Sequence, residues 1–333
     1  MYHSWLDRWD ERRAQRGDAV KEEAAFALDA QLAFPSAENG ECIAGFCDLA
    51  EQAVAAGTFF DEPEGSDLDF EWHDGWIIFA SSILTDTAEN NVVWAKVTES
   101  RSKDRALVIF HHWNANARYG QLARFFSRRG LTVVQIAMPY HLERDRPASS
   151  HADYMLSANL GRTIQSVRQA VLDGRKLIRV LQHRGYGEVS VLGMSLGSWV
   201  AGLVAANDRA VRKAVLCLTA GSLADMVWTG RATRHIRAGL EGHIDQAQLG
   251  RAWSLLDLEN YTDRMARPDL ELQIVLARRD TVVLPDLSKR LTAKLQLAGA
   301  RADVLELNCG HYSLSLPPYI LRTGFRASRL LNA

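Results

Sequence analysis

The arrangement of apolar and polar residues differs between the two ends of the chain. From about residue 71 onward, short apolar runs alternate with segments in which apolar residues recur every three or four positions. Continuous apolar runs are typical of strands buried on both faces, and the longer spacing is typical of helices. Strands are expected at 76–81, 91–97, 106–110, 131–138, 213–218, 272–277 and 303–307. A further short strand is expected to begin at residue 188. This alternation predicts an α/β fold with a mainly parallel sheet covered by helices on both faces.

Helices are expected between most of these strands. They are predicted near 119–126, 160–181, 287–297 and 317–331. Gly174 lies on the apolar face of the longest of them, where a missing side chain would allow the helix to pack closely on the sheet. A polar turn separates the first two strands, which are therefore expected to pair antiparallel.

Residues 1–65 are expected to form a helical N-terminal extension that packs on the main domain, residues 66–333. The Ala- and Glu-rich segment 18–33 predicts one helix, and the segment 42–56, closed by a glycine, predicts a second. The acidic, turn-forming stretch 61–67 is the best candidate for the boundary. An alternative role for the extension is an arm that docks a partner.

Residues 222–267 interrupt the alternation of strands and helices. Apolar residues at helical spacing predict a helical insertion, at the place where a lid over a site would lie. Met226, Trp228 and Trp253 would then form an apolar wall for an acyl or aromatic group. The internal packing of the lid explains the same three residues equally well.

Composition indicates a soluble globular protein, and a formal net charge of −1 over 333 residues gives no support for nucleic acid as a main partner. Four cysteines are too sparse for a disulfide framework and are expected to be structural thiols. No apolar run reaches the ~18 residues of a membrane span, and the charged first thirty residues do not resemble a signal peptide. A cytoplasmic location is therefore expected, and the sequence leaves the oligomeric state open.

The stretch from Glu188 to Val200 carries the strongest chemical signal. An apolar strand runs into Gly193-Met194-Ser195-Leu196-Gly197 and continues as a helix rich in small residues. A turn that directs the Ser195 hydroxyl away from the backbone needs neighbours without a Cβ, and the helix N-terminus behind it supplies unpaired N–H groups. The pattern is that of a nucleophile elbow.

A serine hydroxyl needs a base to take its proton and a third group to orient the base. In open α/β sheets such groups lie at the carboxyl ends of strands. Asp280 and His311 follow the last two expected strands, whereas Glu306 lies inside a strand and is a poorer acid candidate. Each residue also has a purely structural interpretation: Ser195 as a helix cap, Asp280 as a turn cap, and His311 as a loop histidine.

These motifs, in the order serine, aspartate, histidine, resemble the α/β-hydrolase superfamily from about residue 71 to the C-terminus. Residues 278–285 resemble its acid loop, and residues 310–314 resemble its histidine loop. The resemblance implies an α/β-hydrolase fold. It also implies three catalytic roles: Ser195 as nucleophile, His311 as general base and then acid, and Asp280 as the group that orients His311.

An oxyanion hole is the second requirement of such a site. The resemblance implies main-chain donors at Leu196 and at Trp113, in the loop after the strand 106–110. The family usually has His-Gly in this loop, and the chain has His111-His112 instead, so the sequence leaves the loop geometry open. Adjacent histidines also suggest a metal, but neighbours on an extended chain point apart and no third ligand is spaced to join them. No metal or other cofactor is expected.

The loop 139–147 follows another expected strand. It resembles a Pro-Tyr-His…Arg-x-Arg-Pro loop of the α/β-hydrolase domain-containing-18 type and, more loosely, dienelactone-hydrolase-like and acylaminoacyl-peptidase-like branches. His141, Arg144 and Arg146 would then bind an acidic group of the substrate. A structural loop held by Arg–Asp pairs is the alternative.

The sequence thus predicts a serine hydrolase that cleaves a carboxylic ester or thioester of a small molecule through an acyl-enzyme. The residues expected to line the substrate site are His112, His141, Met194 and Trp228. Two alternatives stay open: an acyltransferase that uses the same triad, and a non-catalytic relative that acts as a scaffold.

Overall fold

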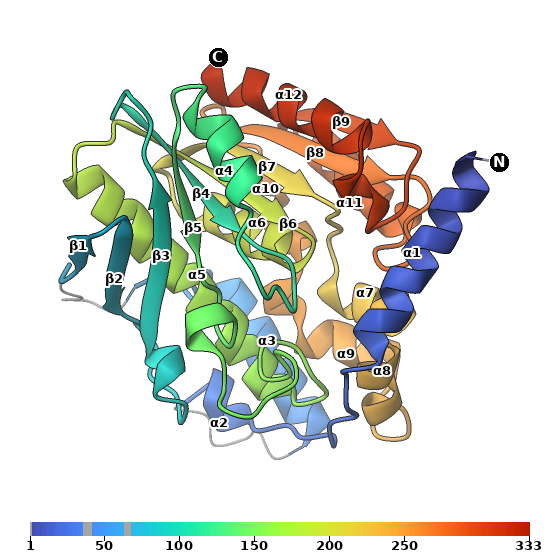
Figure 1. The fold of residues 1–333 in the computed structure, drawn as a ribbon. Helices are drawn as coiled ribbons and strands as arrows, with labels where there is room; N and C mark the ends of the chain where they lie inside the picture. The colour runs from blue at the N-terminus through green and yellow to red at the C-terminus, as the bar shows by residue number, and fades with distance from the viewer. Residues whose placement is uncertain (1, 36–41, 63–67) are drawn as a thin grey trace.

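The computed structural model describes residues 2–35, 42–62 and 68–333. Its centre is a nine-stranded sheet with the order β1-β2-β3-β5-β4-β6-β7-β8-β9 (Figure 1). The strands are β1 (Glu71–His73), β2 (Trp76–Ala80), β3 (Val92–Thr98), β4 (Arg105–Phe110), β5 (Thr132–Ile136), β6 (Glu188–Met194), β7 (Val211–Cys217), β8 (Glu271–Ala277) and β9 (Arg301–Leu307). β1, β2 and β3 pair antiparallel, as does β3 with β5, and the pairs from β5 through β9 are parallel. The predicted mainly parallel sheet is confirmed.

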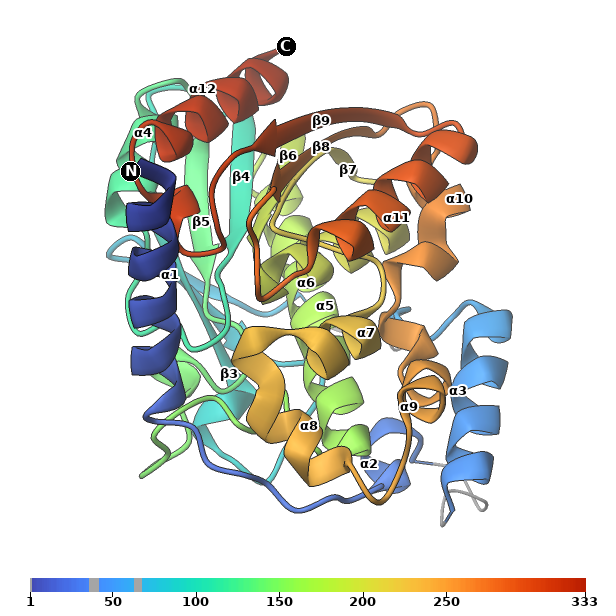
Figure 2. The ribbon, with the colours of Figure 1, turned by 90° about the vertical axis from the view of Figure 1, so that its right-hand side faces the viewer.

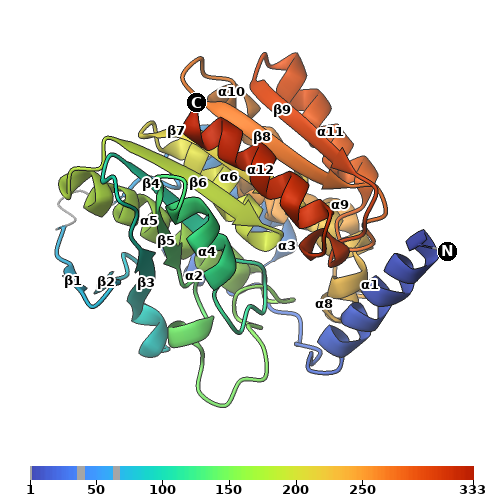
Figure 3. The ribbon, with the colours of Figure 1, turned by 45° about the horizontal axis from the view of Figure 1, so that its top comes forward.

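Helices cover both faces of this sheet (Figure 3). α4 (Gly120–Ser127) and α12 (Tyr319–Asn332) contribute to the apolar core on one face. α5 (Leu160–His183), α6 (Leu196–Asn207) and α11 (Pro285–Leu297) contribute to the core on the other. Alternate residues of β4 enter the two cores, because successive side chains of a strand point to opposite faces. The continuous apolar run of β4 follows from this double burial.

Gly174 lets α5 approach the sheet closely, as its position on the apolar face predicts. A Cβ at this position would lie 2.7 Å from Cζ of Phe110 at the end of β4. Atoms that close overlap, so a larger residue would push the helix or the ring aside.

The insertion predicted at 222–267 is helical. It contains α7 (Leu223–Thr229), η3 (Arg231–Thr233), α8 (Arg234–Leu240), α9 (Gln246–Ala252), η4 (Ser254–Leu256), η5 (Leu258–Tyr261) and α10 (Thr262–Met265). Met226 and Trp253 are 4% and 1% exposed, so they are part of its packed interior. The main chain of Arg231 donates to the carbonyl of Thr281, which ties the insertion to the loop after β8. Its role as a lid stays a prediction.

The second expected N-terminal helix is present as α3 (Ile43–Ala56). The Sγ of Cys42 caps its first turn, and Gly57 ends it in a left-handed conformation with φ 71°. α3 packs against α9 of the insertion. The boundary predicted at residue 65 lies outside the described residues.

The prediction of a helix over residues 18–33 is wrong. α1 (Tyr2–Asp18) ends where that helix was expected to begin, and within the rest of the segment 18–33 only α2 (Ala30–Ala33) is helical. Between them the main chain of Ala27 donates to the carbonyl of Ala158 and accepts from the amide of Leu160. These long-range bonds satisfy the backbone in an extended form, and helix propensities of under about 1 kcal/mol per residue do not outweigh them.

All four cysteines are free thiols. Within residues 2–35, 42–62 and 68–333, no helix combines the length and the apolar character needed to cross a membrane.

Candidate active site

The elbow between β6 and α6 has the strained geometry that its sequence predicts. Ser195 has φ 52° and ψ −123°, a conformation that costs about 1–3 kcal/mol and persists only where its surroundings enforce it. A Cβ at position 193 would lie 2.2 Å from the carbonyl oxygen of Gly197. A Cβ at position 197 would lie 2.4 Å from the carbonyl oxygens of Phe110 and His111 at the end of β4. Both glycines are therefore required by close backbone contacts.

Ser195, His311 and Asp280 form a hydrogen-bonded chain. Nε2 of His311 lies 3.0 Å from Oγ of Ser195, and Nδ1 of His311 lies 2.7 Å from Oδ2 of Asp280. The carboxylate can only accept, so Nδ1 carries the proton and the lone pair of Nε2 faces the serine hydroxyl. Ser195 stands at the N-cap position of α6, but its side chain makes no capping bond.

The two carboxylate oxygens of Asp280 make different sets of contacts. Its Oδ1 accepts hydrogen bonds from the amides of Val282 and Val283, each at 2.8 Å, which caps the turn after β8. Its Oδ2 accepts from His311, and the side chain is only 2% exposed. Glu306 instead pairs with Arg278 at 3.3 Å. The turn thus fixes the carboxylate that is hydrogen-bonded to His311.

The loop after β4 lies beside the elbow and is held at several points. The amide of His112 donates to the hydroxyl of Tyr119 at 3.2 Å, and the indole of Trp113 donates to the carbonyl of Ala152 at 2.9 Å. Leu196 is the first residue of α6, where amides lack an intrahelical partner. Within the described chain, no hydrogen-bond acceptor is assigned to the amide of Leu196 or of Trp113.

Comparison with known proteins agrees with this architecture. A family model described as alpha/beta hydrolase domain containing 18 matches residues 129–238. No match was found among curated protein sequences. Acetyl xylan esterase 1 from Thermoanaerobacterium is a similar solved structure, with a TM-score of 0.62 at 17% identity over 92% of this chain and 100% of that one. The chain has the α/β-hydrolase fold.

Two further structures share this α/β-hydrolase fold with the chain. An esterase from Pyrococcus furiosus has a TM-score of 0.56 at 14% identity, over 80% of this chain and 92% of that one. An acylaminoacyl peptidase from Pyrococcus horikoshii has a TM-score of 0.57 at 11% identity, over 78% of this chain and 40% of that one.

His141 is not in a position to bind a substrate, and that prediction is corrected. Its side chain is 2% exposed, and both ring nitrogens are used. Nε2 accepts from the amide of Asn114 at 2.9 Å, and Nδ1 donates to the carbonyl of Pro139 at 2.8 Å. Asn114 has φ 58°, so this histidine holds a strained residue of the loop that contains Trp113. The sequence does not indicate this role, because Asn114 and His141 are 27 positions apart.

The two arginines of the loop 139–147 are structural, which decides between the alternatives left open by the sequence. Arg144 is fully buried and pairs with Asp173 on α5 at 2.9 Å. Arg146 pairs with Asp153 at 2.9 Å. The loop is therefore held by Arg–Asp pairs, and the buried guanidinium of Arg144 is not free for an acidic substrate group.

The other residues expected to line the substrate site lie in different surroundings. Part of His112 is exposed to solvent. Desolvation by the protein around the ring, followed by the nearby His311, lowers the pKa of His112 to about 4. Met194 ends β6 directly before the elbow and is partly buried. Trp228 lies on α7, with the guanidinium of Arg237 5.4 Å from its ring centre. Their contact with a substrate stays a prediction.

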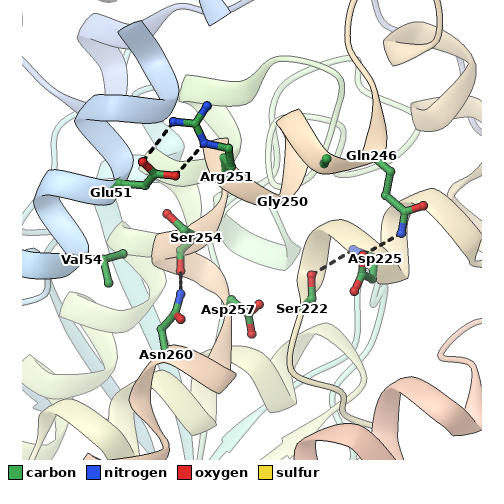
Figure 4. Close-up of a pocket in the computed structure, with 11 residues that line it drawn as sticks. Glu51, Val54, Ser222, Asp225, Gln246, Gly250, Arg251, Ser254, Asp257 and Asn260 are labelled. Atoms are coloured by element: carbon green, nitrogen blue, oxygen red, sulfur yellow. Dashed lines mark hydrogen bonds and ion pairs between the residues drawn. The ribbon is translucent and has the colours of Figure 1, made fainter. Parts of the chain in front are cut away.

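A polar cavity of about 730 Å³ lies between α3 and the insertion (Figure 4). Glu51 and Arg251 form an ion pair at 2.7 Å on one wall, and Asp225 and Asp257 lie on others. Burial raises the pKa of Asp257 to about 6. None of the residues of the Ser195–His311–Asp280 chain lines this cavity, so it is separate from the elbow.

Sequence reasoning missed the contribution of α1 to the surroundings of His311. The carboxylate of Asp10 accepts a hydrogen bond from the amide of Tyr312 at 2.7 Å, across 302 positions of sequence. No local pattern distinguishes Asp10 from the other charged residues of α1.

Proposed function

We propose that the chain is a serine hydrolase that cleaves a carboxylic ester or thioester through an acyl-enzyme on Ser195. The observation that supports this most directly is the chain of hydrogen bonds from Ser195 Oγ through His311 to Asp280, at 3.0 and 2.7 Å. A structural N-cap serine would bond to the first turn of its own helix, and Ser195 does not.

His311 accepts the hydroxyl proton at Nε2 while Oγ attacks the carbonyl carbon of the substrate. Asp280 keeps the proton on Nδ1 and stabilises the imidazolium that forms. The amides of Leu196 and Trp113 would donate to the developing oxyanion, where one lost donor typically costs about 2.7–4 kcal/mol of transition-state stabilisation. His311 then protonates the leaving alcohol or thiol. A water molecule then attacks the acyl carbon while Nε2 takes its proton, and His311 returns this proton to Oγ of Ser195 as the bond between Oγ and the acyl carbon breaks and the acid is released.

Two measurements test this proposal. An active-site-directed fluorophosphonate is expected to label the wild-type chain and not Ser195→Ala. Ser190→Ala, a buried serine on β6 five residues earlier, is the matched control and is expected to be labelled. A panel of p-nitrophenyl esters graded by acyl length then gives kcat and KM for each substrate. A folded wild-type chain that is neither labelled nor active on any ester would contradict the proposal and favour a scaffold.

Product analysis distinguishes hydrolysis from acyl transfer by the same triad. With an added acceptor alcohol, a hydrolase releases mainly the free acid. Release of mainly a new ester would contradict hydrolysis and assign the chain as an acyltransferase.

A further inference from the structure

The N-terminal helix α1 lies beside the segment that follows β9 and carries His311 (Figure 2). Asp7 pairs with Arg279, the residue before Asp280, and Glu11 pairs with Arg231 of the insertion at 3.0 Å. Leu6 is fully buried in the core that also contains Cys309 and Leu314, on the two sides of His311. The helix is therefore attached to the acid loop, the insertion and the histidine loop at once.

Among the residues of α1, Asp10 bonds to the main chain directly after His311. Its Oδ1 accepts hydrogen bonds from the amides of Tyr312 at 2.7 Å and Ser313 at 3.0 Å, the two residues after His311. Ser313 begins η6 (Ser313–Ser315), so the carboxylate caps a helical turn whose first amides would otherwise lack partners. Bonds from amides to a carboxylate are charge-assisted and about twice as strong as bonds between neutral groups.

The other oxygen of Asp10 lies against the residue before His311. Oδ2 is buried and has no hydrogen-bond partner among the described residues. A Cβ at position 310 would lie 2.6 Å from it, so Gly310 leaves the space that the carboxylate occupies. A buried carboxylate oxygen without a donor is costly, and the two charge-assisted bonds of Oδ1 oppose that cost.

We infer that Asp10 is a positioning residue of the active site, which holds the histidine loop so that Nε2 of His311 faces Ser195. The inference rests on the proposed function. Asp10 does not touch the reacting atoms, and it acts through the main chain on both sides of the histidine. A displacement of about 1 Å of a catalytic group can cost about 100-fold in rate, and two lost amide bonds would allow such a displacement.

The test compares Asp10→Ala, Asp10→Asn and Glu11→Ala with the wild type. Glu11→Ala is the matched control, because Glu11 follows Asp10 on α1 and is half-exposed, and its partner Arg231 keeps Asp18. Each protein is assayed for kcat and KM on the best p-nitrophenyl ester and for its rate of fluorophosphonate labelling. Melting temperatures are measured alongside, and all assays are run well below the lowest of them.

Asp10→Ala is expected to lower kcat and the labelling rate about 10- to 100-fold with little change in KM. The side-chain carbonyl of Asp10→Asn can still accept from both amides without the charge, so its kcat should lie between those of Asp10→Ala and the wild type. Glu11→Ala should keep the wild-type kcat.

Equal kcat in Asp10→Ala and the active wild type overturns the inference and leaves the proposed function intact. A kcat above that of the wild type also overturns it, since α1 would then obstruct access to the site. If Asp10→Ala does not fold, Asp10→Ser takes its place, because its shorter side chain cannot accept from both amides, and a wild-type kcat in Asp10→Ser overturns the inference. A wild type that is neither labelled nor active contradicts the proposed function, and the inference with it.

Discussion

Arg144 and Asp173 form a salt bridge of 2.9 Å in which both side chains are 0% exposed. Arg144 also donates to the carbonyl of Asn90 at 2.7 Å and to that of Ala137 at 3.1 Å. The pair thereby joins the loop after β5 to the middle of α5. That loop also carries His141, whose ring accepts a hydrogen bond from the amide of Asn114 in the loop after β4. The salt bridge therefore helps to hold the loop that lies beside the elbow.

Arg144→Met is expected to lower the free energy of unfolding by about 3–5 kcal/mol, because it leaves the carboxylate of Asp173 buried without a cation. Arg146→Met is the control: the side chain of Arg146 is 34% exposed, and its pair with Asp153 should be worth about 1 kcal/mol or less. Urea unfolding followed by circular dichroism measures both. Equal losses in the two variants would contradict the assignment of Arg144 as the buried support.

Gly174→Ala is expected to destabilise the protein by about 1–3 kcal/mol through overpacking, since the new methyl group would lie 2.7 Å from the Phe110 ring. Gly250→Ala is the matched control on α9, where nothing lies within 4 Å of the new Cβ. There the same substitution should stabilise the helix by about 0.5–1 kcal/mol. Melting temperatures that shift in the same direction for both variants would count against close packing at Gly174.

The free energy of unfolding is expected to fall as the pH is lowered below about 6.5. Burial lowers the pKa of His141 to about 3, while a histidine in the unfolded chain has a pKa of about 6.5. Below that value the unfolded chain binds a proton that the folded chain excludes, so the stability is fully present above pH 6.5 and is lost toward the folded pKa. Between pH 6.5 and 5 the loss is about 2 kcal/mol for this histidine.

Urea unfolding of the wild type and of His141→Gln at several pH values measures this loss. The variant lacks the titrating group, so its stability should depend less steeply on pH in this range. Parallel pH profiles for the two proteins would show that His141 does not titrate differently in the folded and unfolded states.

Asp280→Asn is expected to lower kcat by about 10⁴-fold with little change in KM. The asparagine amide would donate to Nδ1 of His311, which places the proton on Nε2 and removes the acceptor for the hydroxyl of Ser195. Glu306→Gln is the control, because Glu306 pairs with Arg278 at the sheet edge and should not affect kcat. A larger loss in Glu306→Gln than in Asp280→Asn would exchange the two assignments.

Local sequence patterns were sufficient for most of the parallel sheet and for the elbow. The strands β4 to β9 were predicted because each carries its own apolar run, and the elbow because two glycines flank Ser195. The expectation that Asp280 and His311 would meet Ser195 followed from their position after the last two strands, since parallel strands end at the same edge of the sheet. The structure places all three within hydrogen-bond distance.

The tertiary structure decided those features whose partners lie far apart in the chain. Ala- and Glu-rich residues before α2 indicate a helix, yet backbone bonds to Ala158 and Leu160 hold Ala27 extended. Arg144 and His141 have the composition of a binding loop, yet burial commits their polar atoms to Asp173 and to the main chain. Propensity and spacing depend on neighbours along the sequence, whereas burial and long-range hydrogen bonds depend on neighbours in space. The sequence by itself therefore determined the sheet and the elbow, and only the folded chain placed Asp10 beside the histidine loop.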